Sequence, residues 1–299
     1  MCGIVGLFLK DPALESELGS MLADMLVELG DRGPDSTGVA VYGHETPGRW
    51  KLTLRLPADL TGPDLAAALG EGLNADVAME ARGVHALLLI PAEIAANAVR
   101  WLRRERPDVV VVGEGRRMEL YKDVGRPEAV TARIGLRQAA GTHGVGHTRM
   151  ATESAVTIDG AHPFSTGPDQ CLVHNGSLSN HNDLRRRLRR EGFSFRTEND
   201  TEVAAGYLSW RMTQGSSLGE ALEASLADLD GFYTFVVGAE SGFGVLRDTY
   251  ACKPAVMAET GRYVAFGTEY RALAGLPGID GARVWEPEPR IAYFWENAA

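Results

Sequence analysis

The second residue of the chain is a cysteine, in the run Met1-Cys2-Gly3-Ile4-Val5-Gly6. If Met1 is removed, Cys2 carries a thiol and a free α-amine on the same residue. An α-amine has a pKa of about 7.7–8, so it could accept the thiol proton without a histidine. A nucleophile that brings its own base predicts attack on a carbonyl carbon. The alternative is an ordinary small apolar residue at the start of a strand.

A thiol that attacks an amide also needs hydrogen-bond donors for the oxyanion that forms. Asn175-Gly176 offers a side-chain amide and an unshielded backbone N–H directly after an expected strand. We therefore expect these two residues to form an oxyanion hole for Cys2. Asn-Gly is also the commonest signal for a tight hairpin turn, so a turn is the alternative.

Two charged side chains could hold a substrate by its ends. Arg149, at the end of an expected strand, could bind a carboxylate with two parallel hydrogen bonds. Asp200 could pair with an ammonium group, or it could cap the helix that follows it. Together they would recognise an α-amino acid by its two charges. Arg32 is expected to shape the pocket near the nucleophile.

The hydrophobic pattern predicts the elements that must place these residues. A buried strand is expected at 3–9, and apolar residues recur at helical spacing over about 13–29. Further strands are expected at 38–42, 118–122, 144–149, 170–174, 232–238, 242–246, 263–266 and 291–294, and further helices at 127–138, 180–191, about 200–212 and 218–228. Strands near both chain ends, with helices between them, favour antiparallel sheets covered by helices.

The pattern changes between about residues 57 and 115. A strand at 86–90, a helix at 93–104 and a strand at 109–112 follow one another there. We expect this stretch to be a small α/β unit inserted into the host fold.

Composition excludes several classes of protein. A net charge of −10 over 299 residues argues against nucleic acid as a partner, because phosphate binding needs a basic field. Arginine-rich runs at 100–104 and 185–190 suggest solvated or subunit-facing helix surfaces, with an anion site as the alternative. No membrane span or signal peptide is evident. The three cysteines are far apart, so we expect a cytoplasmic protein without a structural metal.

As a set, the motifs resemble the class II glutamine amidotransferase family. The resemblance rests on Cys2-Gly3-Ile4-Val5-Gly6, Arg32-Gly33-Pro34-Asp35-Ser36, Gly146-His147-Thr148-Arg149, His174-Asn175-Gly176, Asn199-Asp200-Thr201-Glu202, Asp230-Gly231-Phe232, Arg247-Asp248 with Lys253-Pro254, and Gly267-Thr268-Glu269. It implies the α+β fold of N-terminal nucleophile hydrolases, a four-layer αββα sandwich. That domain would cover residues 2–299 and carry the inserted α/β subdomain at 57–115.

The resemblance also implies roles for single residues. Cys2 would form a γ-glutamyl thioester and release ammonia, with Asn175 and Gly176 as the oxyanion hole. The substrate-binding residues that it implies are Arg149, Asp200, Arg32, His147 and Thr152. Of these, His147 is expected to support its loop rather than transfer protons. The chain departs from the family pattern at Met150, Glu153 and Asn199, which could alter the lid of the pocket.

Within the family, the chain resembles the stand-alone amidotransferase-like subunit of N-methylglutamate synthase, a split relative of glutamate synthase. This implies a glutaminase that takes L-glutamine and passes ammonia to partner synthase subunits of a hetero-oligomer in glutamate and methylamine metabolism. FMN and iron–sulfur clusters are expected only on those partners, and no cofactor in this chain. Neither nucleic acid nor membrane is expected as a partner.

Two other functions stay open from the sequence. If Met1 were retained, its peptide bond would remove the amine base, and the chain would be a degenerate structural or regulatory subunit of that complex. Alternatively, the chain could hydrolyse another amide from an N-terminal cysteine. The pairing of Arg149 with Asp200 favours an amino-acid substrate over that second alternative.

Overall fold

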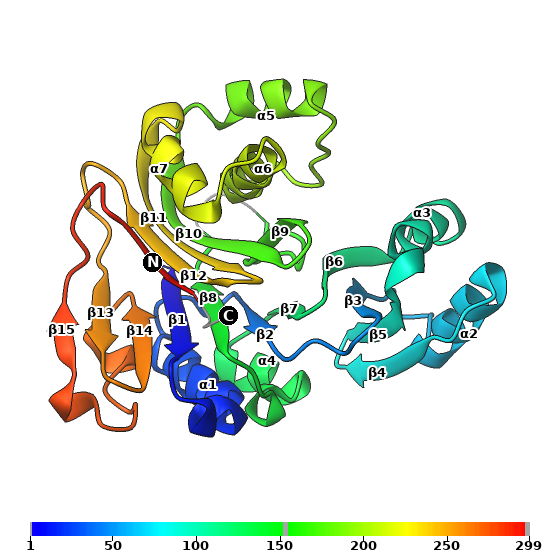
Figure 1. Ribbon diagram of the computed structural model, residues 1–299, viewed down its shortest axis with the longest axis horizontal. Helices are drawn as coiled ribbons and strands as arrows, with labels where there is room; N and C mark the ends of the chain where they lie inside the picture. Colours follow the sequence, from blue (N-terminus) through cyan, green and yellow to red (C-terminus); the bar gives the residue numbers. More distant parts are fainter. Residues whose placement is uncertain (1, 152–154, 297–299) are drawn as a thin grey trace.

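The computed structural model describes residues 2–151 and 155–296 (Figure 1). In this part of the chain, a seven-stranded sheet has the order β15 (Arg283–Trp285), β13 (Val256–Glu259), β14 (Tyr263–Gly267), β1 (Gly3–Leu9), β8 (His143–Arg149), β2 (Ser36–Tyr42) and β7 (Met118–Val124). A five-stranded sheet has the order β16 (Ala292–Glu296), β12 (Gly242–Arg247), β11 (Gly231–Ala239), β10 (Gln170–Leu178) and β9 (Phe164–Gly167). All paired strands in both sheets are antiparallel.

The two sheets pack face to face, with helices on both outer faces. Apolar side chains of β1 and β8 meet those of β10, β11 and β12 in one buried cluster. The helix α1 (Leu18–Glu28) packs on the outer face of the first sheet, where α4 (Pro127–Arg133) also lies. On the second sheet lie α5 (His181–Arg190), α6 (Asp200–Thr213) and α7 (Leu218–Asp228) (Figure 1). These four layers confirm the predicted αββα fold.

The strand β10 is longer than the sequence pattern predicts. It was expected to end at His174, but it continues to Leu178, and Gly176 pairs with Tyr233 of β11. Asn175-Gly176 is therefore not a hairpin turn. Gly176 has a φ of +150°, and a Cβ there would lie 2.0 Å from the carbonyl oxygen of Phe232, so only glycine fits.

The helix expected at 127–138 is interrupted. The helix α4 ends at Arg133, because Gly135 adopts a left-handed conformation with a φ of +67°. A short 3₁₀ turn, Leu136–Gln138, follows. This break is a common way for helices to end.

The inserted unit has its own sheet and its own core. Its elements in chain order are β3 (Arg49–Arg55), α2 (Gly62–Leu73), β4 (Ala78–Arg82), β5 (His85–Pro91), α3 (Ala95–Glu105) and β6 (Val110–Gly115). The sheet order is β4-β5-β3-β6, the arrangement of a ferredoxin-like β-α-β-β-α-β unit. The unit projects from one side of the body (Figure 1).

This sheet begins at Arg49, before the range 57–115 expected for the insert. Trp50, Leu52 and Leu54 alternate with polar residues and pack with α2 and α3 in the insert's core. This alternation is the pattern of a half-buried strand, and the expected range 57–115 leaves it out.

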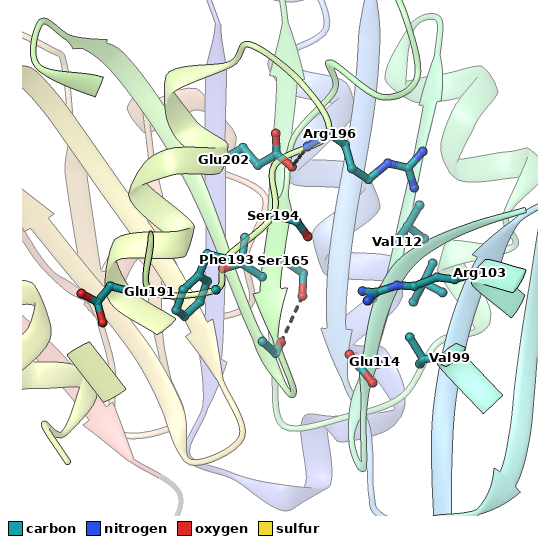
Figure 2. A pocket seen from close by; sticks show the side chains of 15 residues that line it. Val99, Arg103, Val112, Glu114, Ser165, Glu191, Phe193, Ser194, Arg196 and Glu202 are labelled. Atoms are coloured by element: carbon teal, nitrogen blue, oxygen red, sulfur yellow. Dashed lines mark hydrogen bonds between the residues drawn. The ribbon is translucent and has the colours of Figure 1, made fainter. Parts of the chain in front are cut away.

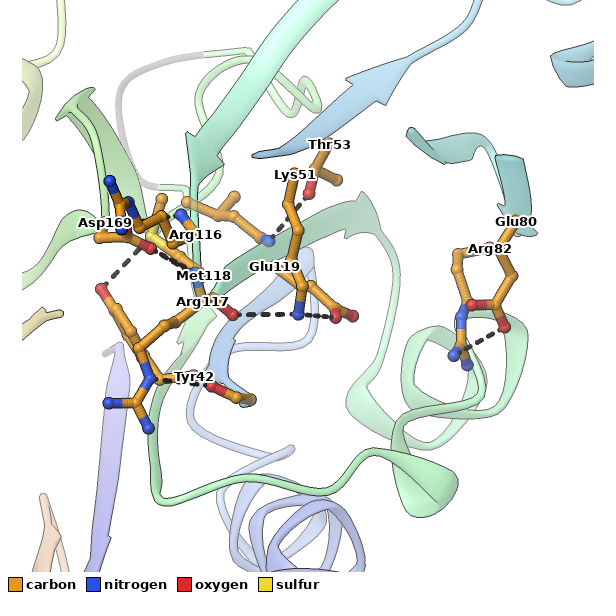
Figure 3. A network of polar contacts seen from close by, with 12 residues as sticks. Tyr42, Lys51, Thr53, Glu80, Arg82, Arg116, Arg117, Met118, Glu119 and Asp169 are labelled. Atoms are coloured by element: carbon orange, nitrogen blue, oxygen red, sulfur yellow. Dashed lines mark hydrogen bonds and ion pairs between the residues drawn. The ribbon is translucent and has the colours of Figure 1, made fainter. Parts of the chain in front are cut away.

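Asp169, in the turn between β9 and β10, holds the chain where it leaves the insert. Its buried carboxylate accepts the backbone N–H groups of Arg116 at 2.7 Å, Arg117 at 2.9 Å and Met118 at 2.8 Å (Figure 3). Nearby, the Lys51 ammonium lies 2.7 Å from the Glu119 carboxylate and ties β3 to β7 (Figure 3). These charged contacts fix the insert to the body at its base.

Candidate active site

The cavity around Cys2 has a volume of about 630 Å³, a usual size for a small-molecule site. Five separate segments form its wall. The lining residues are Cys2, Arg149, Met150, Ala151, Ala155, Thr157, Gly160, His162, His174, Asn175, Gly176, His181, Thr197, Glu198, Asn199, Asp200 and Thr201. The sequence-predicted residues Cys2, Asn175, Gly176, Arg149 and Asp200 are all among them.

Cys2 is held by its backbone, while its side chain is partly exposed. The Cys2 carbonyl oxygen accepts Arg32 Nε at 3.1 Å and Asn175 Nδ2 at 3.3 Å. Its Sγ lies 3.8 Å from the carbonyl oxygen of Met150. The thiol therefore sits at the start of β1 with its main chain fixed, as positioning a nucleophile requires.

Asn175 and Gly176 come to the cavity from β10, in the sheet opposite β1. Besides the Cys2 carbonyl, Asn175 Nδ2 also lies 3.4 Å from the Thr268 hydroxyl oxygen. That hydroxyl in turn accepts the Ile4 N–H at 2.8 Å, so it joins β1 to the donor side chain. The predicted oxyanion donors thus line the same cavity as Cys2, and they come from a strand instead of a turn.

Arg149 ends β8 and is only 7% exposed. Its carbonyl oxygen accepts the Asp35 N–H at 3.0 Å, and its backbone forms a bridge with Pro34. Gly33 allows this approach, because a Cβ there would lie 2.3 Å from the carbonyl carbon of Thr148. The motif at 32–36 therefore holds the strand end from which the guanidinium enters the cavity.

Asp200 is the first residue of α6, but it does not cap that helix. The cap is Asn199, whose side chain accepts the Thr201 N–H at 2.9 Å. Asp200 Oδ2 instead accepts the Leu178 N–H from the end of β10 at 2.9 Å. Its other oxygen lies 3.7 Å from His174 Nδ1. The carboxylate is thus placed in the cavity wall, opposite in charge to Arg149.

A layer of three histidines lies at the base of the cavity. The rings of His147 and His162 are 4.1 Å apart, and the Thr201 hydroxyl lies 2.7 Å from His162 Nε2 and 2.9 Å from His174 Nδ1. Burial lowers the pKa of His147 to about 3 and holds those of His162 and His174 below their usual values. Such histidines are neutral at pH 7 and are weak bases.

Three other predicted substrate-binding residues have different outcomes. Among the residues that the structure describes, Arg32 is not part of the cavity lining; it holds the Cys2 carbonyl and forms an ion pair with Glu269. In the described part of the chain, His147 of β8 is buried and does not line the cavity, and its ring packs against that of the lining residue His162. Thr152 lies outside the described residues, as does Glu153.

A loop that the sequence did not single out forms another part of the wall. It carries Gly160 and His162, and the buried Lys122 ammonium donates to the Ala161 carbonyl oxygen at 2.8 Å. From the insert, Arg55 Nη2 reaches the two carboxylate oxygens of Asp159 at 3.0 and 3.1 Å. No local sequence pattern identifies this loop as part of the cavity wall. Its role is evident only from its contacts in the folded protein.

A second cavity, of about 370 Å³, lies at the junction of the insert and the body. Arg103 and Glu114 of the insert face Ser165, Phe193 and Ser194 of the body (Figure 2). The described residues that line it include no cysteine, so Cys2 marks the other cavity as the reactive one. The segment between α5 and α6, residues 191–199, contributes to both cavities.

Across residues 2–151 and 155–296, the helices are too short or too polar to cross a membrane.

Known proteins that are similar to this chain are described as glutamine amidotransferases. A family model described as a glutamine amidotransferase domain matches residues 147–275. The chain is 59% identical to the glutamine amidotransferase-like protein GlxB of Rhizobium meliloti, over 99% of both chains. It is 34% identical to a putative glutamine amidotransferase of Methanothermobacter thermautotrophicus, over 91% of this chain and 93% of that protein.

Among solved structures, the fold is similar to that of larger enzymes. The glutamine phosphoribosylpyrophosphate amidotransferase of B. subtilis superposes with a TM-score of 0.63 at 19% identity. A structure described as the allosteric regulatory enzyme of purine biosynthesis gives a TM-score of 0.65, also at 19% identity. In both cases the match covers 99% of this chain and 47% of the other. At this identity the likeness concerns the fold.

Proposed function

The chain belongs to the glutamine amidotransferase family, and we propose that it hydrolyses L-glutamine at Cys2 and passes the ammonia to a partner synthase subunit. One observation carries the proposal: a single cavity collects a thiol, two amide donors, a guanidinium and a carboxylate. The guanidinium and the carboxylate suit the α-carboxylate and α-ammonium groups of an amino acid. The thiol and the amide donors suit attack on its side-chain amide.

In the proposed reaction Met1 has been removed, and the α-amine of Cys2 is the base. The sulfur attacks the side-chain amide carbon of glutamine while the thiol proton moves to the amine. Asn175 Nδ2–H and Gly176 N–H donate to the oxyanion. The protonated amine then gives its proton to the leaving nitrogen, the C–N bond breaks, and ammonia departs. Water attacks the thioester that remains, which releases glutamate and restores the thiol.

The buried histidines support the choice of the amine as base. With a pKa of about 3, His147 holds almost no proton at pH 7 and has little tendency to take one from a thiol. His174 faces the cavity, but burial lowers its pKa as well, with the nearby Asp200 opposing that shift. An α-amine titrates near the working pH and is the better matched group.

Glutamine hydrolysis tests the proposal directly. The wild type is expected to release ammonia and glutamate, and Cys2→Ala is expected to lose at least about 10³-fold of that rate. The control is Cys252→Ala. Cys252 is an exposed thiol, and it is not one of the described residues that line the cavity. The intact mass of the native protein is expected to lack Met1. No hydrolysis together with a retained Met1 would identify a structural subunit instead.

For the partner, we propose the synthase subunits of a complex similar to N-methylglutamate synthase. Support comes from the motif set and from the two relatives matched over 99% and 93% of their own lengths, which leaves those proteins little room for a synthase domain. Purification of the native complex and mass spectrometry of its subunits test this. Recovery of the chain alone, or with an unrelated type of enzyme, would contradict it.

A further inference from the structure

Arg185, in the middle of α5, is not part of a solvated surface. The arginine-rich run at 185–190 was expected to face solvent or another subunit, but the Arg185 side chain is only 3% exposed. Its guanidinium points to the segment that joins α5 to α6. The expectation is therefore wrong for this residue, because one position of the amphipathic helix faces inward.

We propose that Arg185 is a positioning residue for glutamine recognition, because it holds the peptide that carries Asp200. The inference rests on the proposed function, since it assigns Asp200 to the substrate's α-ammonium group. Arg185 Nη1 donates to the Thr197 carbonyl oxygen at 2.9 Å, and Nη2 donates to the Asn199 carbonyl oxygen at 3.2 Å. Asn199 directly precedes Asp200, so the second bond fixes the peptide from which that carboxylate projects.

The two carbonyl contacts matter more than the accompanying ion pair. Arg185 also pairs with Glu198, but the Glu198 side chain is 87% exposed, and exposed ion pairs contribute little. A buried cation donates both hydrogen bonds to the carbonyl groups. Without it, the carbonyl oxygens of Thr197 and Asn199 would each lose a charged donor. The planar guanidinium reaches both carbonyls at once, which a lysine ammonium on a flexible stem does not do as well.

Glu202 holds the same segment from the other side. Its carboxylate accepts the N–H groups of Arg196 and Thr197, both at 2.8 Å, from within α6. Residues 196–199 are therefore held by two side chains: Arg185 binds their carbonyl groups, and Glu202 binds their N–H groups. With Asp200 Oδ2 on the Leu178 N–H, these bonds define where the other carboxylate oxygen lies. The segment that carries Asp200 is thus held at its carbonyl groups and at its N–H groups, which orients the carboxylate.

The test compares glutamine with glutaramate, which is glutamine without its α-amino group. In Arg185→Met, the KM for glutamine is expected to rise about 10- to 100-fold, the loss of one charge-assisted contact, while kcat changes less than about threefold. The kcat/KM for glutaramate is expected to stay within about threefold, because this substrate makes no bond to Asp200. Arg185→Lys is expected to show part of the same effect.

Two controls separate positioning from general damage. Arg186→Met changes the neighbouring, exposed arginine, which pairs with Asp183, and is expected to leave both substrates unaffected. The rate of Cys2 alkylation by iodoacetamide is expected to match the wild type in every variant. An equal loss of kcat/KM for both substrates in Arg185→Met, or an unchanged preference for glutamine, would overturn the inference.

Binding distinguishes this inference from the proposed function. Calorimetric Kd values for glutamine and glutaramate, measured on Cys2→Ala with and without Arg185→Met, need no turnover. A wild type that binds glutamine without hydrolysing it would refute the proposed reaction, yet a selective loss of glutamine affinity would still support the role of Arg185. A wild type that does not bind glutamine would refute both.

Discussion

Mild acid is expected to remove a large part of the folding free energy of this protein. Five of its seven histidines are buried. Burial lowers the pKa of every one: to about 4 for His85, to about 3 for His143 and His147, and below the usual value for His162 and His174. In the unfolded chain each would titrate near about 6.5. Unfolding therefore takes up protons below that pH, so this stabilisation is complete above it and is lost as the pH falls.

The magnitude follows from the number of groups. Between about pH 7.5 and about pH 5.5, one such histidine changes the free energy of unfolding by about 1.4 kcal/mol. Together His85, His143 and His147 give about 4 kcal/mol, against a total of about 5–15 kcal/mol for a typical domain. The lowered pKa values of His162 and His174 add to the loss in the same direction. Carboxylates with an ordinary pKa near about 4 stay largely ionised over this interval and add little.

Urea unfolding at the two pH values measures this difference. The variant His143→Gln removes one of the five groups at a site away from the cavity, between Thr142 and the Ala239 carbonyl oxygen. Its own stability will be lower, but its pH-dependent loss is expected to shrink by about 1.4 kcal/mol. A loss below about 2 kcal/mol in the wild type, unchanged in the variant, would refute the reasoning, because the histidines would then be charged in the folded protein.

Three further outcomes are expected. Asp169→Ala should lower the free energy of unfolding by about 3–5 kcal/mol in denaturant titrations, because three backbone N–H groups lose a charged acceptor; a loss under about 1 kcal/mol would contradict this. Gly33→Ala should raise the glutamine KM at least about tenfold, since its Cβ would meet the Thr148 carbonyl group; the control Gly261→Ala has nothing within 4 Å of the new Cβ and should behave as wild type. Arg149→Lys should raise the glutamine KM about 10- to 100-fold with a smaller change in kcat, and steady-state kinetics showing equal KM values would refute its role as a carboxylate clamp.

Much of the host fold was predictable from residue patterns. The strand β1 is a continuous apolar run that is buried along its whole length, and the helix α7 buries one periodic set of side chains. The structure has both at or near the expected residues. The strands β9, β13 and β15 were not predicted. Each has three or four residues, too few to show alternation, and they form only because a neighbouring strand offers hydrogen bonds.

The site was predictable where chemistry depends on residue type, and not where it depends on position. A cysteine, an Asn-Gly pair, an arginine and an aspartate stand out in the sequence, and the structure brings all of them to one cavity. By contrast, the side chains of Arg185 and Lys122 act on carbonyl groups of distant segments. The sequence does not distinguish these two side chains from other arginines and lysines, because the groups that they contact are backbone carbonyl oxygens, which every residue has.

The insert joins the body at the tip of a single pair of strands, β2 and β7. Tyr42 of β2 pairs directly with Met118 of β7, and the Gly43 N–H donates to the Arg117 carbonyl oxygen, so the chain leaves and returns at adjacent positions. Without the insert, β2 and β7 would form a plain β-hairpin. Hairpin tips accept long additions at little cost to folding. A shortened chain with a tight turn in place of the insert should therefore keep the cavity around Cys2, although it loses the contact of Arg55 with Asp159 and the side chains of Val110 and Val112 from the core cluster of the body. The same hairpin tip offers an entry point for grafting other domains onto this fold.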